Sequence, residues 1–204
     1  MTCKLCEQKK AKRQCLPSGG EICPSCCAAG REITIECPLD CVYLQESRFH
    51  EKPPPIPVET IPNRDIEVTE DFLRRQEPLL MWLSMTLMQA MVKGKAVDSD
   101  AKEGLAALIQ TYRTKNSGLI YESRPANPYA AAIQESLRES IADIEKRAQQ
   151  ELTDYALRDA DVLGVLVFLE RMALQYANGR RRGRAFLDFL RASFPMPKPT
   201  ENAA

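Results

Sequence analysis

The residues best equipped for chemistry in this 204-residue chain are its eight cysteines, all of which lie within the first 41 positions. Cys3 and Cys6 have the C-x2-C spacing, as do Cys23 and Cys26. Two intervening residues let both thiolates reach one ion from a tight turn, as tetrahedral zinc with sulfur ligands at about 2.3 Å requires. The sequence therefore predicts metal ligation by the set Cys3, Cys6, Cys15, Cys23, Cys26, Cys27, Cys37 and Cys41.

Disulfide bonds are the main alternative use of clustered cysteines, and they form in exported proteins. The first residues contain no apolar run typical of a secretory signal, so we expect a cytoplasmic protein with reduced thiols. An iron–sulfur cluster is less well supported because the typical C-x2-C-x2-C run is absent. A thioredoxin-like redox site would need a βαβ context that the sequence does not provide. We therefore expect zinc, which would supply on the order of 10 kcal/mol of folding free energy to a segment with little apolar content.

The run Cys3-x2-Cys6-x8-Cys15-x7-Cys23-x2-Cys26 resembles the first part of a B-box zinc finger. The resemblance implies two zinc ions in a cross-brace, in which the first and third ligand pairs share one ion and the second and fourth pairs share the other. Carried over to this chain, it implies that the first zinc is bound by Cys3, Cys6, Cys23 and Cys26. It also implies that Cys15 joins Cys37 and Cys41 at the second zinc.

The chain departs from the B-box pattern at two points. Ser18 stands where the pattern has an aspartate ligand, and cysteines would have to replace the late histidine ligands. A fourth ligand for the second ion is therefore open, and either Cys27 or His50, the only histidine, can supply it.

Composition divides the chain into four segments, with the cysteines confined to a zinc-binding finger over residues 1–50. Residues 51–68 contain five prolines and are expected to form a semi-extended linker, because proline fixes φ and lacks a backbone donor. Residues 69–195 have helical apolar periodicity, and the tail at 196–204 is expected to be disordered. The predicted fold class is a small Cys-rich zinc-binding domain plus an all-α domain, a four- or five-helix bundle.

Capping residues and breakers predict where the helices begin and end. Thr69 is expected to cap the first helix, which Pro78 must kink or restart and Gly94 ends. Asp100 and Glu103 are expected to form a capping box for the second helix, and Asn127 with Pro128 to open the third. Asp161 is expected to precede a fourth helix that is apolar all round over 162–169 and is therefore the buried centre. The apolar positions of a short fifth helix are Phe186, Phe189 and Leu190.

Two basic clusters are the candidate nucleic-acid contacts. The chain has no net formal charge, which argues against a polycation that coats nucleic acid or anionic membrane. The cluster residues are Lys9, Lys10, Lys12 and Arg13 near the N-terminus, and Arg180, Arg181, Arg182 and Arg184 near the C-terminus.

The cysteine ligation predicts a structural rather than a catalytic metal site, because catalytic zinc keeps an open position and usually draws on His, Asp or Glu. No phosphate loop, dinucleotide fingerprint, HExxH motif or Ser–His–Asp set is present. We therefore expect a non-enzymatic adaptor or regulatory protein with a protein partner and no membrane contact. The first alternative is a nucleic-acid-binding regulator that uses the basic clusters. The second is an enzyme with a pocket around Tyr121, Glu122 and Arg124.

Overall fold

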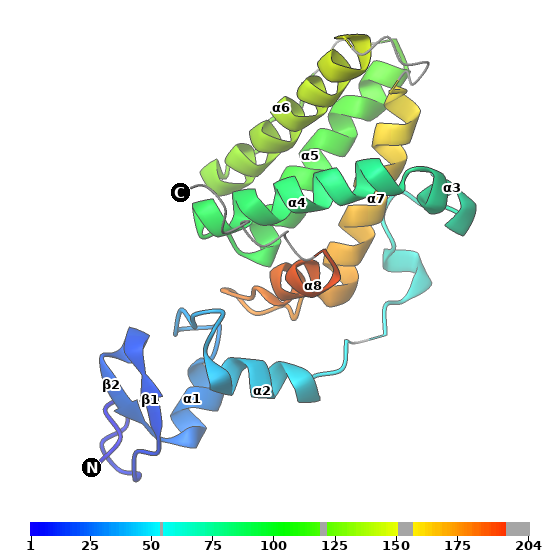
Figure 1. Cartoon of the computed structure of the whole chain (residues 1–204). Helices are drawn as coiled ribbons and strands as arrows, with labels where there is room; N and C mark the ends of the chain where they lie inside the picture. The colour runs from blue at the N-terminus through cyan, green and yellow to red at the C-terminus, as the bar shows by residue number, and fades with distance from the viewer. Residues whose placement is uncertain (54, 119–121, 151–156, 195–204) are drawn as a thin grey trace, which may run out of the picture.

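The computed structural model describes residues 1–53, 55–118, 122–150 and 157–194, without the side chain of residue 149. Its cysteine-rich segment lies against one end of a larger helical part (Figure 1). Within the described ranges, no helix combines the length and the apolar composition that crossing a bilayer would need.

The cysteine-rich segment consists of a two-stranded antiparallel hairpin followed by two helices. The strands are β1 (Arg13–Cys15) and β2 (Gly20–Ile22), joined by the 3-10 turn η1 (Leu16–Ser18), and the helices are α1 (Pro24–Gly30) and α2 (Val42–His50). Gly19 closes the hairpin turn at φ +71°, a left-handed conformation that favours glycine. Apart from cysteines, the described apolar side chains buried here are Ala11, Ile22, Ile35 and Leu44. This small apolar set agrees with the expectation that burial alone does not fold the segment.

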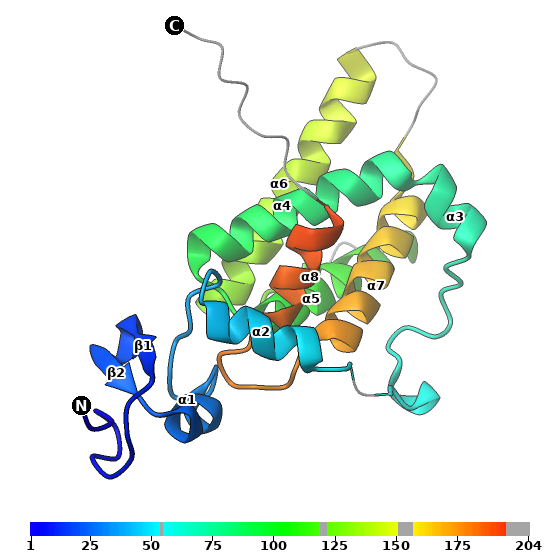
Figure 2. The same cartoon turned by 60° about the horizontal axis from the view of Figure 1, so that its bottom comes forward.

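The helical part contains six helices in the described residues, because the first predicted helix is divided in two. Their bounds are α3 (Glu70–Arg75), α4 (Glu77–Gly94), α5 (Asp98–Asn116), α6 (Pro128–Gln150), α7 (Asp159–Tyr176) and α8 (Ala185–Ser193). Helix α5 packs against both α6 and α7, α4 packs against α6, and α8 lies across α4 and α7 (Figure 2). A mostly helical fold with a separate cysteine cluster is therefore confirmed.

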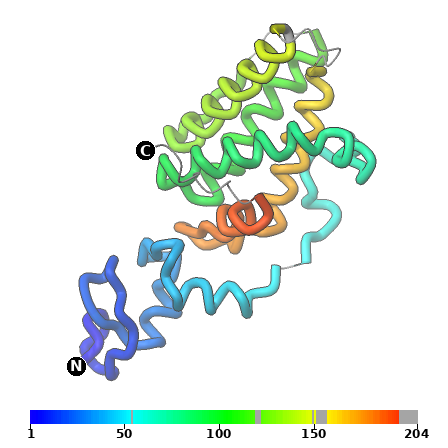
Figure 3. The backbone as a smooth tube through the Cα atoms, in the orientation of Figure 1, coloured from blue at the N-terminus to red at the C-terminus, as the bar shows by residue number. Residues whose placement is uncertain are grey.

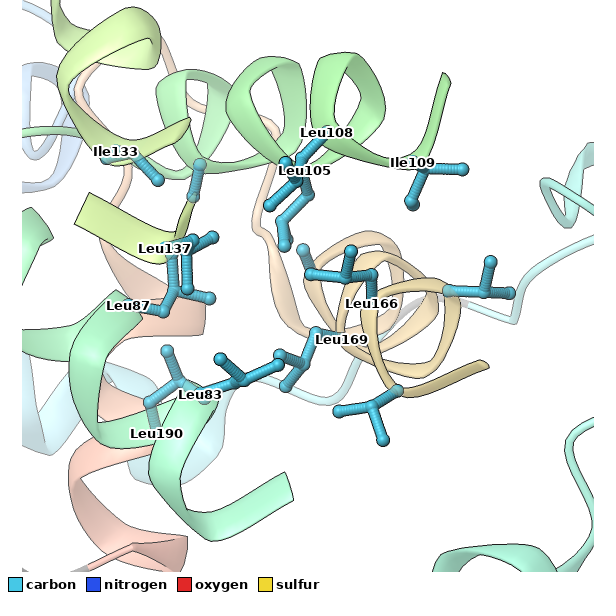
Figure 4. Close-up of a cluster of buried hydrophobic side chains, with 14 of the residues drawn as sticks. Leu83, Leu87, Leu105, Leu108, Ile109, Ile133, Leu137, Leu166, Leu169 and Leu190 are labelled. Carbon is cyan, nitrogen blue, oxygen red and sulfur yellow. The ribbon is translucent and has the colours of Figure 1, made fainter. Parts of the chain in front are cut away.

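Leucine and isoleucine side chains from five helices meet in the core of the helical part (Figure 4). Helix α7 is buried through most of its length, as its all-round apolar pattern predicts. The labelled core residues are Leu83, Leu87, Leu105, Leu108, Ile109, Ile133, Leu137, Leu166, Leu169 and Leu190.

Most predicted helix boundaries agree with the structure. The Thr69 hydroxyl accepts a hydrogen bond from the Phe72 amide at 3.1 Å and caps α3, and Pro78 lies in the first turn of α4, which restarts there. The Asn127 side chain accepts from the Tyr129 amide at 3.0 Å, with Pro128 as the first residue of α6.

Two boundaries were predicted too late. Helix α5 begins at Asp98, so Asp100 lies in its first turn, where its carboxylate accepts from the Val97 amide at 2.9 Å. Glu103 has no part in this cap, and its carboxylate instead accepts from the Asn127 side chain at 3.3 Å. Helix α7 begins at Asp159, and Asp161 lies inside it.

The second half of the proline-rich segment is fixed to the helical part. Arg113 donates to both carboxylate oxygens of Asp65 at 2.6 and 2.8 Å, and Arg171 donates to the carbonyl oxygens of Asn63 and Ile66 at 2.7 and 2.9 Å. This segment includes the 3-10 turn η2 (Val58–Thr60). The predicted tail at 196–204 lies outside the described residues, and the four-segment division stays a prediction.

Candidate metal centre

Four cysteine sulfurs, which we call the first set, lie close together. The sulfurs of Cys3, Cys6, Cys23 and Cys26 all lie within 4.8 Å of one another, and those of Cys6 and Cys23 are 4.0 Å apart. Tetrahedral ligation with bonds of about 2.3 Å places sulfurs roughly 3.8 Å apart, so the first set fits one metal ion. Cys3 and Cys23 are buried, and the other two are partly exposed.

Local backbone structure brings the two C-x2-C pairs together. The Cys3 amide donates to the Lys9 carbonyl, and the Glu7 amide donates to the Cys3 carbonyl, both at 2.8 Å, which closes the turn around the first pair. The Lys4 amide donates to the Glu21 carbonyl at 3.0 Å and attaches this turn to β2. Cys23 caps α1, so Cys26 follows it by about one helical turn and faces the same point.

Hydrogen bonds to sulfur adapt the first set to negative charge. The Cys23 amide donates to Cys3 Sγ at 3.1 Å, and the Cys26 amide donates to Cys23 Sγ at 3.4 Å. Burial raises the pKa of the Cys3 thiol, but backbone donors, the Cys23 amide foremost, outweigh it and lower that pKa to about 6. Hydrogen bonding with Cys23 and burial raise the pKa of Cys26 to about 12. Four thiolates at this separation therefore need a cation among them.

The remaining cysteines, which we call the second set, line one cavity of about 340 Å³. They are Cys15, Cys27, Cys37 and Cys41. Among the residues that the structure describes, no three of their sulfurs lie as close together as those of the first set. The structure thus brings the second set to one cavity without gathering its sulfurs around one point.

The two candidates for the fourth ligand of the second set are placed differently. Cys27 lies on α1, lines the cavity and is 8% exposed. His50 is the exposed last residue of α2 and does not line the cavity. Ser18, at the position of the B-box aspartate, donates from its hydroxyl to the Cys15 carbonyl at 3.0 Å and stabilises the hairpin turn.

A tight turn carries the chain from Cys27 to Cys37. The amides of Ile33, Thr34 and Ile35 all donate to the Gly30 carbonyl, at distances from 2.9 to 3.1 Å. A Cβ atom at Gly30 would lie 2.8 Å from Ile35 Cδ1 and 3.0 Å from Thr34 Oγ1, so a larger residue there would force these side chains to shift.

The N-terminal basic cluster lies on the cysteine-rich segment with mixed exposure. Lys10 and Lys12 are exposed, and the Lys9 ammonium donates to the Ser25 hydroxyl at 3.1 Å. Arg13 donates to Cys27 Sγ at 3.3 Å, and its guanidinium lies 4.6 Å from the centre of the Tyr43 ring.

Three arginines of the C-terminal basic cluster contact the cysteine-rich segment. Arg180 lies 3.7 Å from the Glu32 carboxylate, Arg182 pairs with Glu36 at 3.4 Å, and Arg184 donates to the Cys37 carbonyl. Arg181 is exposed. Nucleic-acid binding by these residues stays a prediction, and their contacts have a structural explanation without it.

The candidate pocket between α5 and α6 is described only in part. Tyr121 lies outside the described residues. Glu122 and Arg124 form an exposed ion pair at 3.3 Å, and the nearby Ser123 amide donates to the Thr111 hydroxyl at 3.1 Å. The described residues here account for a surface connection between two helices.

Sequence reasoning missed Glu32, a carboxylate that is only 1% exposed. It lies between Cys27 and Cys37 and contacts Arg48, Asn178, Arg180 and the Arg184 amide. The sequence carries no signal for this role, because no apolar periodicity or known motif includes it.

Comparison of the chain with protein-family models, with curated proteins and with solved structures finds no match. The resemblance of residues 3–41 to a B-box finger therefore stays a prediction.

Proposed function

We propose that this protein is a non-enzymatic zinc-binding adaptor or regulatory protein that acts by contacting a protein partner. The observation that carries the proposal is the closed arrangement of the first set, in which four sulfurs lie within 4.8 Å of one another. Four thiolates fill a tetrahedral ion's coordination sphere and leave no position for a substrate or an activated water. Such a site supports a fold rather than a reaction.

Zinc is the metal that we propose for both cysteine sets. Thiolate ligands in tetrahedral geometry select zinc or iron among the common ions, and zinc needs no redox partner. We propose one ion in the first set and a second ion in the second set, with Cys27 rather than His50 as its fourth ligand. No disulfide bond joins the eight cysteines, which leaves them available as ligands, and we propose a reducing, cytoplasmic location.

The helical part is proposed as a bundle that serves as a second contact surface. Its core is apolar. The buried carboxylates of Asp98 and Asp100 cap helices and that of Asp161 pairs with Arg158, so these groups do not converge on a pocket. The buried Ser84 hydroxyl has no hydrogen-bond partner among the described residues. A contact role for both parts therefore needs no catalytic group.

Native mass spectrometry of the full chain, purified without added metal or chelator, tests the zinc proposal. We expect zinc to co-purify with the wild-type chain and Cys23→Ser to lose the ion of the first set. Glu21→Gln, an exposed change two residues earlier, is the matched control and should keep it. A metal-free wild-type chain, or one that carries iron, would contradict the zinc assignment.

Crosslinking in the source cell, followed by capture of the full chain, tests the adaptor role. We expect a stoichiometric protein partner whose capture Cys23→Ser reduces and Glu21→Gln does not. Recovery of DNA or RNA whose binding weakens steeply with salt, and weakens further in Arg181→Glu, would instead favour the nucleic-acid alternative.

A further inference from the structure

The loop that joins Cys27 to Cys37 is held by residues from the opposite end of the chain, and Glu32 is the centre of this contact. Its carboxylate accepts from the Asn178 side chain at 2.7 Å and from the Arg184 amide at 3.0 Å, and its carbonyl accepts from the Arg182 amide at 2.8 Å. Figure 3 shows how the chain, after α7, returns toward the cysteine-rich segment before α8 begins. We call these contacts between Glu32 and residues 178–184 the clasp.

The charge of Glu32 is matched from both parts of the molecule. Arg48 of α2 forms an ion pair with Glu32, and Arg180 lies 3.7 Å from the same carboxylate. Arg48 also pairs with Asp188 of α8. A buried carboxylate is costly unless it is hydrogen-bonded and paired. Loss of Glu32 therefore leaves Arg48 and Arg180 with less compensation, and loss of residues 178–184 leaves Glu32 with the Arg48 pair but without two of its hydrogen bonds.

Two further contacts connect the second set to the helical part. Arg184 donates to the carbonyl of Cys37, and Leu39, between Cys37 and Cys41, packs against the apolar core of the helices. The segment that carries Cys27, Cys37 and Cys41 is thus held in part by contacts with the helical part. In contrast, none of the hydrogen bonds and ion pairs described for the clasp involves a residue of the first set.

We propose that the helical part completes the second metal site, so that the clasp and metal binding by Cys15, Cys27, Cys37 and Cys41 stabilise each other. The proposal rests on the second ion of the proposed function. Coupling between two binding events is reciprocal: if the clasp raises the affinity of the second set for zinc, bound zinc tightens the clasp by the same factor. The second set is therefore a metal-dependent joint, whereas the first set folds its own segment only.

A pair of glutamate variants in the full chain tests the joint. Glu32→Gln keeps the size of the side chain and removes its charge. Glu36→Gln makes the same change at an exposed position of the same loop, where the ion pair with Arg182 is solvent-exposed and contributes little. Native mass spectrometry during titration with a chelator counts zinc ions per chain. We expect Glu32→Gln to release the second ion at about tenfold lower chelator concentration, within the usual range of coupling between sites, and Glu36→Gln to match the wild type. Release of the first ion should be unchanged in both.

Asn178→Ala tests the clasp from its helical side, in case Glu32→Gln does not fold. This change removes the donor to Glu32 without altering the cysteine-rich segment, and circular dichroism checks that the helices remain. It should shift release of the second ion in the same direction as Glu32→Gln.

Hydrogen exchange measures the reciprocal effect at the amides of Arg182 and Arg184, which donate to Glu32. Cys37→Ser should accelerate their exchange, and Cys6→Ser should leave it unchanged. Equal release of the second ion in Glu32→Gln, Asn178→Ala and Glu36→Gln would overturn the joint. A wild-type chain that binds only one zinc ion would also overturn the joint, but it would leave the proposed zinc site of the first set intact. A wild-type chain without zinc would contradict both the joint and the proposed function.

Discussion

At the scale of single residues, Asp98 shows how one buried residue connects two helices, α5 and α8. It is 4% exposed, and its oxygens accept from the amides of Phe186 and Leu187 at 3.1 and 3.4 Å, which caps the start of α8. Its own amide donates to the Gly183 carbonyl at 2.8 Å. Burial raises the pKa of Asp98 from 3.8 to about 7, although the two amides act in the opposite direction.

We expect Asp98→Asn to remove a pH dependence of stability. Between pH 4 and pH 7 the folded protein holds a proton at Asp98 that the unfolded chain has released. The free energy of unfolding therefore falls as pH rises, by at most about 1.4 kcal/mol per pH unit. Urea unfolding of the wild type and of Asp98→Asn between pH 5.5 and pH 7.5 checks this. The range stops at pH 5.5 because metal ligation by thiolates weakens at lower pH. Parallel stability curves would contradict the assignment.

At the scale of elements, the helical part depends on close contacts at a few positions. Gly164 of α7 faces the ring of Phe72 of α3, and a Cβ atom there would lie 2.5 Å from Phe72 Cζ. Phe72 packs against the main core, so it has little room to move. The short helix α3 is thus held on α7 by a ring that occupies the space above a glycine.

Gly164→Ala should destabilise the protein by about 1–3 kcal/mol, the usual cost of overpacking a core. This sign is opposite to the gain of about 1 kcal/mol that alanine brings over glycine inside a helix. Gly94→Ala is the control, because Gly94 is the last residue of α4 and a Cβ atom there meets nothing within 4 Å. Thermal unfolding followed by circular dichroism measures both. A stabilised Gly164→Ala would show that Phe72 can move aside without cost.

Local signals made some of these elements predictable and left others out of reach. Thr69, Pro78 and Asn127 act on amides or turns beside them in the chain, so sequence alone placed those boundaries. The C-x2-C spacing likewise predicted each pair of the first set, since each pair is one local turn, whereas the grouping of the two pairs was implied by the resemblance to a B-box finger. The start of α5 was misplaced because Asp98 is held by α8, whose contacts lie 88 residues away. Glu32 was missed for the same reason, since Asn178 lies 146 residues from it.

At the scale of the whole molecule, the two parts are stabilised by different interactions. The helical part buries leucine and isoleucine from five helices, whereas the cysteine-rich segment buries few apolar side chains other than its cysteines. We therefore expect the removal of metal to unfold the cysteine-rich segment and not the helical part, because structural zinc supplies on the order of 10 kcal/mol per site.

Treatment of the full chain with a strong chelator checks this expectation. Trp82, the only tryptophan, lies on α4 and donates to the Ser140 hydroxyl of α6 at 2.7 Å, so its fluorescence reports on the helical part. Its emission and most of the helical circular dichroism should persist while residues 1–50 become sensitive to protease. Complete loss of both signals would show that the helices depend on the cysteine-rich segment for their own stability.

The attachments at Asp65 and Glu51 lie on either side of a short stretch of the proline-rich segment, and both are made to the helical part. Contacts on both sides of this stretch therefore hold the two parts together in addition to the covalent chain. We expect a chain cut between them to remain one particle, with its two fragments joined through the Glu32 network of carboxylate, guanidinium and amide groups.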